Sequence, residues 1–387
     1  MVQAIREEHL DGWLFYNLAH RDPLTDTILN LDIHSPATRP WVYAVLSNGN
    51  HVKIVSTLEP GILDSLPGER YTYQTRDEWI AHLSRFSHLS MAILSDEALP
   101  SLSTLPDSFA TTLRNLGTKL VSAATAIQRA FAILDSKGIE SHEVAAHQLY
   151  AIVENTAMHL CRSYADGKPL TEGDIQDYIL EHTRAGNLES SDSPIVAAGK
   201  NSANPHYEVP GHPFSGPRGK VLCEGDVLQI DLWACQKGGI YADISWVFVY
   251  GTMSRPELDE AFSTVSSARD LALDFILSRC TLQEPITGCE VDAKVREFLL
   301  SKAPQWALRH RTGHSIDRFC HGLGANLDST EFPDSRYLLD GSLFSVEPGL
   351  YYKDFGFRTE INVYMSEHRP IISGGLPQER IITMKDR

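Results

Sequence analysis

The amino-acid sequence predicts an α/β (α+β) protein that is divided into two domains. Its 387 residues exceed the length that one hydrophobic core usually serves. Short apolar runs typical of strands are mixed with stretches of helical periodicity, and the mixture changes near residues 118–124. We therefore expect a smaller α/β domain over residues 1–122 and a larger domain over residues 123–387.

The first of these domains contains one strong hairpin signal. The apolar runs 41–46 and 51–55 flank a segment whose Asn48-Gly49 pair favours a tight turn between two strands. We expect further strands at residues 12–16 and 91–94 and a helix at residues 78–83. Strands and helices that mix in this way indicate an α/β domain.

From about residue 123 the pattern becomes helical. Apolar residues recur at helical spacing as far as Leu134, and helical segments continue to about residue 182. Ser141 and Thr171 are predicted helix N-caps, because a hydroxyl can accept a free backbone N–H. We then expect strands at 194–199, 227–233 and 244–250, a helix at 255–277, and a closing third of strand and loop. Helix-then-strand order occurs twice, which suits two similar α/β halves that face each other across a cleft.

The composition argues against several classes of protein. A hydrophobic fraction of 42% and a charged fraction of 22% are ordinary for a globular protein. The net charge of -16 argues against nucleic acid and acidic membrane surfaces as partners. Six cysteines without a CxxC pair favour reduced, scattered thiols. The N-terminal segment is too acidic for a signal peptide, and no apolar run approaches the roughly 18 residues of a membrane span, so we expect a cytoplasmic protein.

Two aspartates are placed where they could bind a cation. Asp231 ends one apolar run and Asp243 begins the next, so the spacing predicts a hairpin whose two arms each present a carboxylate. Such a pair could chelate one divalent ion, and Asp231 could also bridge to a second. A single aspartate at such a place more often only ends a strand. Asp231, however, stands between Ile230 and Leu232, and a buried carboxylate without a partner is costly.

Three further side chains extend this pair. His314 follows a glycine that lets an imidazole approach a crowded site, although a lone histidine is more often a surface or core residue. Glu347 lies between an apolar run and a Pro-Gly turn, and Glu360 lies on the following strand. Because most of these donors are oxygens, they suit Mn²⁺, with Co²⁺, Fe²⁺ or Zn²⁺ as alternatives. The predicted metal ligands are Asp231, Asp243, His314, Glu347 and Glu360.

This number of carboxylates is enough to bridge two ions. Two metals a few ångströms apart can share a water, lower its pKa towards neutrality and stabilise the oxyanion that forms when hydroxide attacks a carbonyl. Such equipment serves the hydrolysis of an amide. His206 and His321 remain outside the ligand set as acid/base candidates.

In this order of residues the sequence resembles the pita-bread metallopeptidases, the family of methionine aminopeptidase, aminopeptidase P, prolidase and the metal-free creatinase. The order Asp, Asp, His, Glu, Glu matches the five ligands of that family. His321 stands seven residues beyond His314, where a second histidine is expected. Residues 201–207 resemble the segment that carries the other catalytic histidine, here His206.

The resemblance covers about residues 123–387 and implies a pita-bread fold for them. The first 120 residues suit the creatinase-type N-terminal α/β domain that accompanies this fold in the Xaa-Pro peptidase branch. The strings at 346–351 and 357–360 are close to the same branch.

Two departures from the family pattern exist, and neither removes a ligand. Asp231 and Asp243 are 12 residues apart, one more than is usual, which implies one extra residue in the hairpin. Ser245 and Trp246 stand where a Thr-Arg pair is common. Creatinase lacks the metal carboxylates, so the presence of all five ligands argues against a metal-free protein.

The resemblance also implies roles for single residues. His206 would hold or protonate the leaving nitrogen or the substrate carbonyl. His321 would bind that carbonyl and stabilise the tetrahedral intermediate, and Glu347 would pass a proton from the bridging water. Arg358 is expected to orient a carboxylate, with a surface position as the equal alternative, and Tyr207 either to pack or to contact the substrate.

The expected function is that of a two-metal exopeptidase that cleaves the bond before proline, as aminopeptidase P does on longer peptides and prolidase on dipeptides. The substrate would be a peptide with proline after the scissile bond, and a homodimer is expected. The alternative from another class is a catalytically inactive pita-bread scaffold that binds partners. Methionine aminopeptidase is less favoured because the N-terminal domain is long, and creatinase-like C–N hydrolysis is less favoured again.

Overall fold

The computed structural model describes residues 1–211 and 218–385 of the chain, and the protein is a mixed α/β structure, as predicted. The chain divides into two compact units, Met1–Ala130 and Phe131–Arg387. This division lies eight residues after the one expected from the sequence (130 against 122), within a π-helical segment at Gln128–Ala132. Each unit has its own hydrophobic core.

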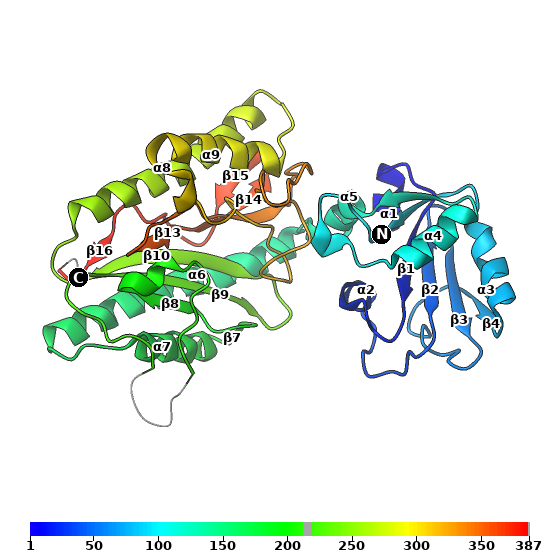
Figure 1. Cartoon of the computed structure of the whole chain (residues 1–387), viewed down its shortest axis with the longest axis horizontal. Coiled ribbons are helices and arrows are strands. Elements are labelled where there is room, and N and C mark those ends of the chain that lie inside the picture. The colour runs from blue at the N-terminus through cyan, green and yellow to red at the C-terminus, as the bar shows by residue number, and fades with distance from the viewer. Residues whose placement is uncertain (212–217, 386–387) are drawn as a thin grey trace. The chain divides into compact units, whose positions relative to one another are not determined.

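The N-terminal unit is a six-stranded mixed sheet with helices packed around it (Figure 1). The predicted hairpin is confirmed, because β2 and β3 pair antiparallel and Gly49 in their turn has a φ of 90°. The sheet order is β4-β3-β2-β1-β5-β6. The strands are β1 (Gly12–Asn17), β2 (Trp41–Leu46), β3 (His51–Ser56), β4 (Glu69–Tyr73), β5 (Ser90–Ile93) and β6 (Lys119–Ser122). The helices are α1 (Val2–Glu7), α2 (Pro23–Ile28), α3 (Arg76–Leu83), α4 (Asp107–Asn115) and α5 (Ala124–Ile127).

The helices of the C-terminal unit test the two predicted caps. The prediction that Ser141 begins a helix is wrong, because Asp135 caps α6 (Ser136–Ala165) and Ser141 lies inside this helix. Thr171 is confirmed, since it forms a capping box with Asp174. The remaining helices are α7 (Glu172–Ala185), α8 (Pro256–Thr281) and α9 (Gly288–Lys302). None of the helices within residues 1–211 and 218–385 is both long and apolar enough to cross a membrane.

The C-terminal unit is built around the long antiparallel hairpin of β9 (Asp226–Gln236) and β10 (Ala242–Tyr250). Short strands extend this sheet, namely β7 (Leu188–Glu189), β8 (Ile195–Ala198) and β16 (Ile382–Thr383). A second sheet contains β11 (Leu343–Val346), β14 (Ile361–Ser366) and β15 (Arg369–Ile372). The strands β12 (Gly349–Tyr351) and β13 (Gly356–Arg358) pair with each other.

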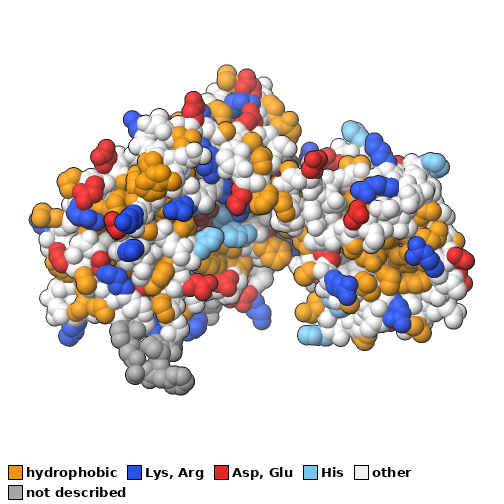
Figure 2. All heavy atoms as spheres, viewed as in Figure 1, with side chains coloured by type: hydrophobic (Ala, Val, Ile, Leu, Met, Phe, Trp, Pro, Cys, Tyr) orange, Lys and Arg blue, Asp and Glu red, His pale blue; other side chains and the backbone are white. Residues whose placement is uncertain are grey.

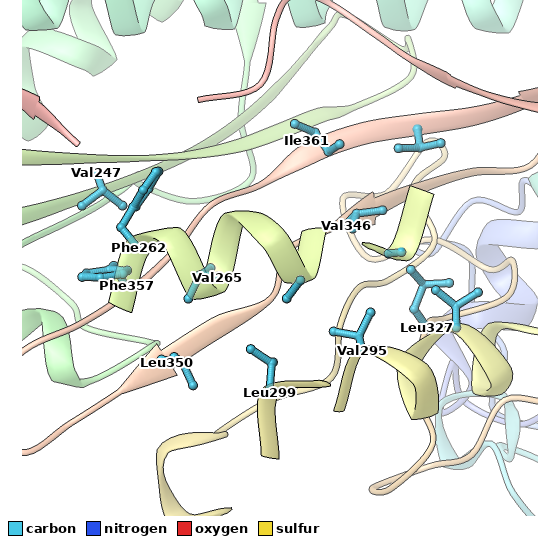
Figure 3. Packing of buried hydrophobic residues seen from close by; sticks show 14 of the residues in the cluster. Val247, Phe262, Val265, Val295, Leu299, Leu327, Val346, Leu350, Phe357 and Ile361 are labelled. Carbon is cyan, nitrogen blue, oxygen red and sulfur yellow. The ribbon is translucent and has the colours of Figure 1, made fainter. Parts of the chain in front are cut away.

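Side chains of β9 and β10 alternate between two cores. Leu228, Ile230 and Phe248 pack with helices α6 and α7. Val247 instead packs with α8, α9 and the strands β11 to β14, as Figure 3 shows for Val247, Phe262 and Phe357. Helices therefore cover both faces of the hairpin (Figure 1). Because successive side chains of a strand point to opposite faces, Asp231, Asp243 and Ser245 lie on the α8/α9 side.

Candidate metal centre

The hairpin of β9 and β10 presents two carboxylates and a hydroxyl on one face. Asp231 on β9 is opposite Ser245 on β10, and Asp243 lies two residues before Ser245. Ser245 Oγ lies 2.8 Å from Asp231 Oδ1 and 3.0 Å from Glu360 Oε2. All four side chains are buried. The predicted hairpin with one carboxylate on each arm is confirmed.

Two glutamates approach the hairpin from the neighbouring strands. Glu347 lies between β11 and β12, where its N–H donates to the carbonyl oxygen of Thr312 at 2.7 Å. Glu360 lies between β13 and β14, and its N–H donates to the carbonyl oxygen of Ser245 at 3.3 Å. These backbone hydrogen bonds fix one glutamate to the segment that precedes His314 and the other to the hairpin.

The ring of His314 is oriented by the backbone of the next residue, Ser315. Its Nδ1 lies 3.1 Å from the carbonyl oxygen of Ser315, so Nδ1–H donates there and Nε2 is left to face the carboxylates. This Nε2 lies 3.4 Å from Glu347 Oε1 and 3.6 Å from Asp243 Oδ2. One donor atom each from Asp243, His314 and Glu360 lie within 4.8 Å of one another. The structure thus brings the five side chains expected as ligands into one buried cluster.

Arg358 is the cation of this cluster. Its guanidinium pairs with Asp231, and its Nε lies 3.7 Å from Glu347 Oε2. Its Nη1 donates to Tyr351 Oη at 3.1 Å and to the carbonyl oxygen of Pro205 at 3.2 Å. Arg358 is 5% exposed, so it contacts the carboxylates and does not lie on the surface.

The two other histidines singled out by the sequence, His206 and His321, are both exposed but differ in their neighbours. The ring centroid of His321 is 4.3 Å from that of His314, with the rings nearly perpendicular. His206 is exposed and directly follows Pro205, whose carbonyl contacts Arg358. Figure 2 shows histidine and acidic side chains gathered in a recess of the C-terminal unit.

Tyr207 is tied to a buried glutamate outside the cluster. Its hydroxyl donates to Glu172 Oε2 at 2.8 Å. Glu172 is fully buried and also accepts the N–H groups of Ala198 and Lys220, each at 2.7 Å. This network fixes the loop that carries His206. In this structure the hydroxyl of Tyr207 has a packing role, which is one of the two alternatives expected for it.

The acids of the cluster are crowded. Burial raises the pKa of Asp231 to about 6, although the charge of Arg358 opposes this shift. Burial, and then the neighbouring carboxylates, raise the pKa of Glu360 well above its usual range. Burial alone would raise the pKa of Glu347 too, but the charge of His314 and those of other nearby cations lower it. Carboxylates that repel one another in this way favour a cation between them.

The histidines respond to the same charges. Burial alone would lower the pKa of His314, but the hydrogen bond to Asp243 and the charge of Glu347 raise it. The charge of His314, and then burial, lower the pKa of His321 to about 4. His321 is therefore neutral at neutral pH.

The donors present fit a divalent metal ion. Within residues 1–211 and 218–385, the buried Asp243 Oδ1 and Glu360 Oε1 have no hydrogen-bond partner. A buried oxygen without a partner is costly, and carboxylate oxygens are preferred ligands of divalent cations. Together with Nε2 of His314 they form a mixed oxygen and nitrogen set of the kind that binds Mn²⁺, Fe²⁺, Co²⁺ or Zn²⁺.

Sequence reasoning missed three side chains of this region. Cys320 Sγ lies 3.0 Å from Asp243 Oδ2, and burial raises the pKa of this thiol well above its usual range. His310 Nε2 lies 2.9 Å from Tyr351 Oη, which in turn contacts Arg358. The only signals were that Cys320 precedes His321 and that His310 and Tyr351 lie close to predicted ligands. Neither signal gives the direction in which these three side chains point.

Comparison with protein families decides the assignment. The model of metallopeptidase family M24 matches residues 136–367, which is more than half of the chain and includes all the side chains of the cluster. The chain belongs to metallopeptidase family M24. The resemblance noted above, to the Xaa-Pro peptidase branch of the pita-bread metallopeptidases, is confirmed.

Curated relatives in family M24 align with part of their length. An Xaa-Pro dipeptidase of Lactobacillus helveticus is 28% identical over 185 residues, which are 48% of this chain and 45% of the relative. The probable dipeptidase PepE of Mycobacterium tuberculosis is 26% identical over 215 residues, which are 55% of this chain and 52% of the relative. The chain thus spans about half the length of these curated relatives.

Solved structures of this fold align over nearly the whole chain. Dipeptidase PepE from Mycobacterium ulcerans has a TM-score of 0.73 at 17% identity and covers 99% of this chain and 95% of its own. X-Pro aminopeptidase from Thermotoga maritima has a TM-score of 0.60 at 21% identity, with coverage of 98% and 99%. The predicted pita-bread fold is confirmed. The N-terminal domain of FACT complex subunit SPT16 from chickpea shares it, with a TM-score of 0.64 at 15% identity over 97% and 94% of the two chains.

Proposed function

We propose that this member of family M24 is an exopeptidase that hydrolyses the peptide bond before proline with two divalent ions, Mn²⁺ being the preferred one. The observation that carries the proposal is the buried cluster, in which two carboxylate oxygens have no partner among the described residues. Relatives described as Xaa-Pro dipeptidases, each 28% identical, support the substrate class. The peptide substrate would have proline after the scissile bond.

The donors of the cluster divide into two groups. Asp243, His314 and Glu360 already have ligand atoms close to one another. Asp231 and Glu347 complete the proposed ligand set, and Ser245 links Asp231 to Glu360. When bound, two divalent ions supply a water of lowered pKa and polarise a carbonyl group.

The remaining roles belong to side chains of the chain itself. Glu347 is held ionised by the neighbouring cations that lower its pKa, so it can accept a proton and pass it on. His321, neutral at neutral pH, can donate a hydrogen bond to an oxyanion. His206, exposed on its loop, would hold or protonate the leaving nitrogen. Arg358 orients Asp231 and Glu347 through its contacts with both.

The second candidate is a catalytically inactive scaffold. The likeness to a FACT complex subunit favours it, because that neighbour is not described as a peptidase. The presence of all five donors in one buried cluster favours the enzyme. Creatinase-like C–N hydrolysis and methionine aminopeptidase activity are weaker candidates for the reasons given above. Homodimerisation and a cytoplasmic location stay predictions from the sequence.

The test combines metal content with turnover. Purified protein should hold two divalent ions per chain and hydrolyse Gly-Pro and Xaa-Pro-Yaa peptides with Mn²⁺. Glu360→Gln and Asp243→Asn should lose metal and lower kcat/KM by more than about 100-fold, since even the partners of metal ligands contribute about 10- to 100-fold. Glu367→Gln, an exposed glutamate, is the control. Full activity of either site variant would refute the site, bound metal without turnover would indicate another substrate, and absence of metal would favour the scaffold.

A further inference from the structure

A pocket of about 720 Å³ is lined by residues 308–311, which shortly precede His314 in the chain, and its charged lining consists of three arginines and one glutamate. Pockets of this size hold ligands larger than a single functional group. Trp306 is 56% exposed and supplies an apolar wall. The charged and titratable side chains of the lining are Arg296, Arg309, His310, Arg311 and Glu331.

Two of the three arginines are free to bind an anion. Arg296 is already occupied, because its Nε lies 3.0 Å from Asp292 Oδ2 and its Nη2 donates to a backbone carbonyl at 2.8 Å. Among residues 1–211 and 218–385, no hydrogen bond or ion pair engages the guanidinium of Arg309 or Arg311. Glu331 is the acid of the lining and is exposed. Arg309 is exposed as well, whereas Arg311 is half-buried.

The pocket is joined to the cluster by neighbouring residues. His310 in its wall contacts Tyr351, which contacts Arg358. Arg311 directly precedes Thr312, whose carbonyl oxygen accepts the N–H of Glu347 at 2.7 Å. A substrate group in the pocket would therefore lie close to the reacting bond.

Charge gives the direction in which a peptide would lie. The free amino terminus of an exopeptidase substrate is positive and is attracted by the acidic cluster, whereas unpaired arginines repel it. The basic pocket therefore suits the part of the peptide that follows the scissile bond. Guanidinium groups bind carboxylates through paired N–H donors.

We propose that this pocket takes the C-terminal part of the substrate and that Arg311 binds a carboxylate there, as a specificity-determining residue. This proposal rests on the proposed function. The carboxylate has two sources: the C-terminus of an Xaa-Pro dipeptide, or the acidic side chain of a residue after proline. The first source makes the protein a dipeptidase, and the second makes it an aminopeptidase that prefers acidic peptides.

Two matched substrate pairs distinguish the sources. The first pair is Ala-Pro and Ala-Pro-NH₂, which differ in the C-terminal charge. The second is Ala-Pro-Asp-NH₂ and Ala-Pro-Asn-NH₂, which differ in the side-chain charge. For at least one pair, the wild-type protein should favour the acid in kcat/KM by on the order of 10- to 100-fold, the effect of a charge-assisted hydrogen bond.

Replacement of the arginine tests its role. Arg311→Met should bring the ratio of that pair close to one, while its metal content and circular dichroism, which report correct folding, match those of the wild-type protein. Arg311→Lys should restore part of the ratio. Arg369→Met, which removes an exposed arginine on β15, should keep the wild-type ratio.

Each other outcome overturns the proposal. Wild-type ratios near one for both pairs, or an Arg311→Met variant that lowers all four substrates equally, would refute the carboxylate site and leave the proposed function intact. Failure of the metal-loaded wild-type protein to cleave any Xaa-Pro peptide would refute the proposed function and, with it, this proposal.

Discussion

Ser245 has a hydroxyl between two carboxylates of the cluster. Its Oγ is within 3.0 Å of oxygens of both Asp231 and Glu360, and the residue is fully buried. A hydroxyl has one proton, so it can donate to one of the two acids at a time. This residue stands where the sequence departs from the family pattern, and the structure shows that the departure keeps a hydroxyl beside the carboxylates.

Removal of this hydroxyl should weaken metal binding. Ser245→Ala leaves Asp231 and Glu360 without the group that orients them, so we expect metal affinity and kcat/KM to fall by about 10-fold or more. Ser245→Thr keeps the hydroxyl and should stay close to wild type. Metal titration of both variants checks this, and equal affinities for the alanine and threonine variants would show that the hydroxyl has no orienting role.

The sequence singled out the residues of the cluster through carboxylates in apolar surroundings and through an order along the chain that matches the family pattern. The carboxylate between Ile230 and Leu232 is one of these, and the structure places Asp231 among the other acids. Cys320 and Tyr351 violated no rule, since a cysteine in a loop and a tyrosine on a buried strand are both ordinary. Their contacts depend on backbone direction, which no local pattern encodes.

The segment that carries His314 depends on the absence of a side chain before it. A Cβ added to Gly313 would lie 2.0 Å from the carbonyl oxygen of Ser345. Backbone atoms would have to move, and the adjoining β-bridge between Ser315 and Phe344 would be strained. The close approach of two backbone segments thus positions the imidazole.

Gly313→Ala should destabilise the protein by about 1–3 kcal/mol and reduce its metal content, because overpacking forces backbone shifts next to a proposed ligand. Gly211→Ala is the matched control, since a Cβ there meets no atom of residues 1–211 and 218–385 within 4 Å. Urea unfolding and metal analysis of both variants test this. A Gly313→Ala protein with wild-type stability and metal content would contradict the structure at this point.

Helix α6 is joined to its surroundings by a buried neutral histidine. His142 Nδ1 donates to the carbonyl oxygen of Tyr241 at 2.7 Å, and its Nε2 lies 2.6 Å from Ser373 Oγ. Burial lowers the pKa of His142 to about 4. The unfolded chain takes up this proton at its ordinary pKa of about 6.5, whereas the folded chain does so only near 4.

The contribution of His142 to the free energy of unfolding is therefore fully present above about pH 6.5 and is lost as the pH falls towards 4. The loss is about 1.4 kcal/mol per pH unit for one group within this window. His142→Gln removes the titration, so its free energy of unfolding should fall less than that of the wild type between pH 7 and 5. Parallel pH dependences in urea unfolding would contradict this assignment.

Predictions at the level of elements succeeded where the signal is local. Thr171 and Asp174 are three residues apart, and their reciprocal hydrogen bonds form without help from the rest of the fold. The prediction for Ser141 was wrong because Asp135, which comes earlier in the chain, already caps the same helix. The sequence did not predict which residues pair in the closing third of the chain, because its short strands pair residues that are separated in sequence, such as Val346 and Ile361.

At the scale of the whole molecule, metal removal should act on one of the two units. Ions that bind only the native state raise its stability, by about 2.7 kcal/mol when their free concentration is 100 times the Kd. Because all the proposed ligands lie in Phe131–Arg387, a chelator should lower the unfolding temperature of this unit and leave that of Met1–Ala130 unchanged. Calorimetry with Mn²⁺ and with EDTA checks this. Equal shifts of both transitions, or none, would contradict it.

The predicted division into two domains rests on the change from mixed strands to long helices, which is visible in the sequence near residues 118–124. The pairing of the two halves of the C-terminal unit was only suggested by the repeated helix-then-strand order. It depends on β9 and β10, whose alternate side chains pack against different pairs of helices. Such a shared hairpin is a property of long-range packing, which a pattern of apolar residues does not specify.

In the proposed function, the buried cluster of acids and one imidazole binds two divalent ions. The most direct measurement is anomalous X-ray scattering at the manganese edge from crystals grown with Mn²⁺. We expect two peaks per chain, enclosed by Asp231, Asp243, His314, Glu347 and Glu360. A fully ordered cluster without an anomalous peak among these five side chains would contradict it.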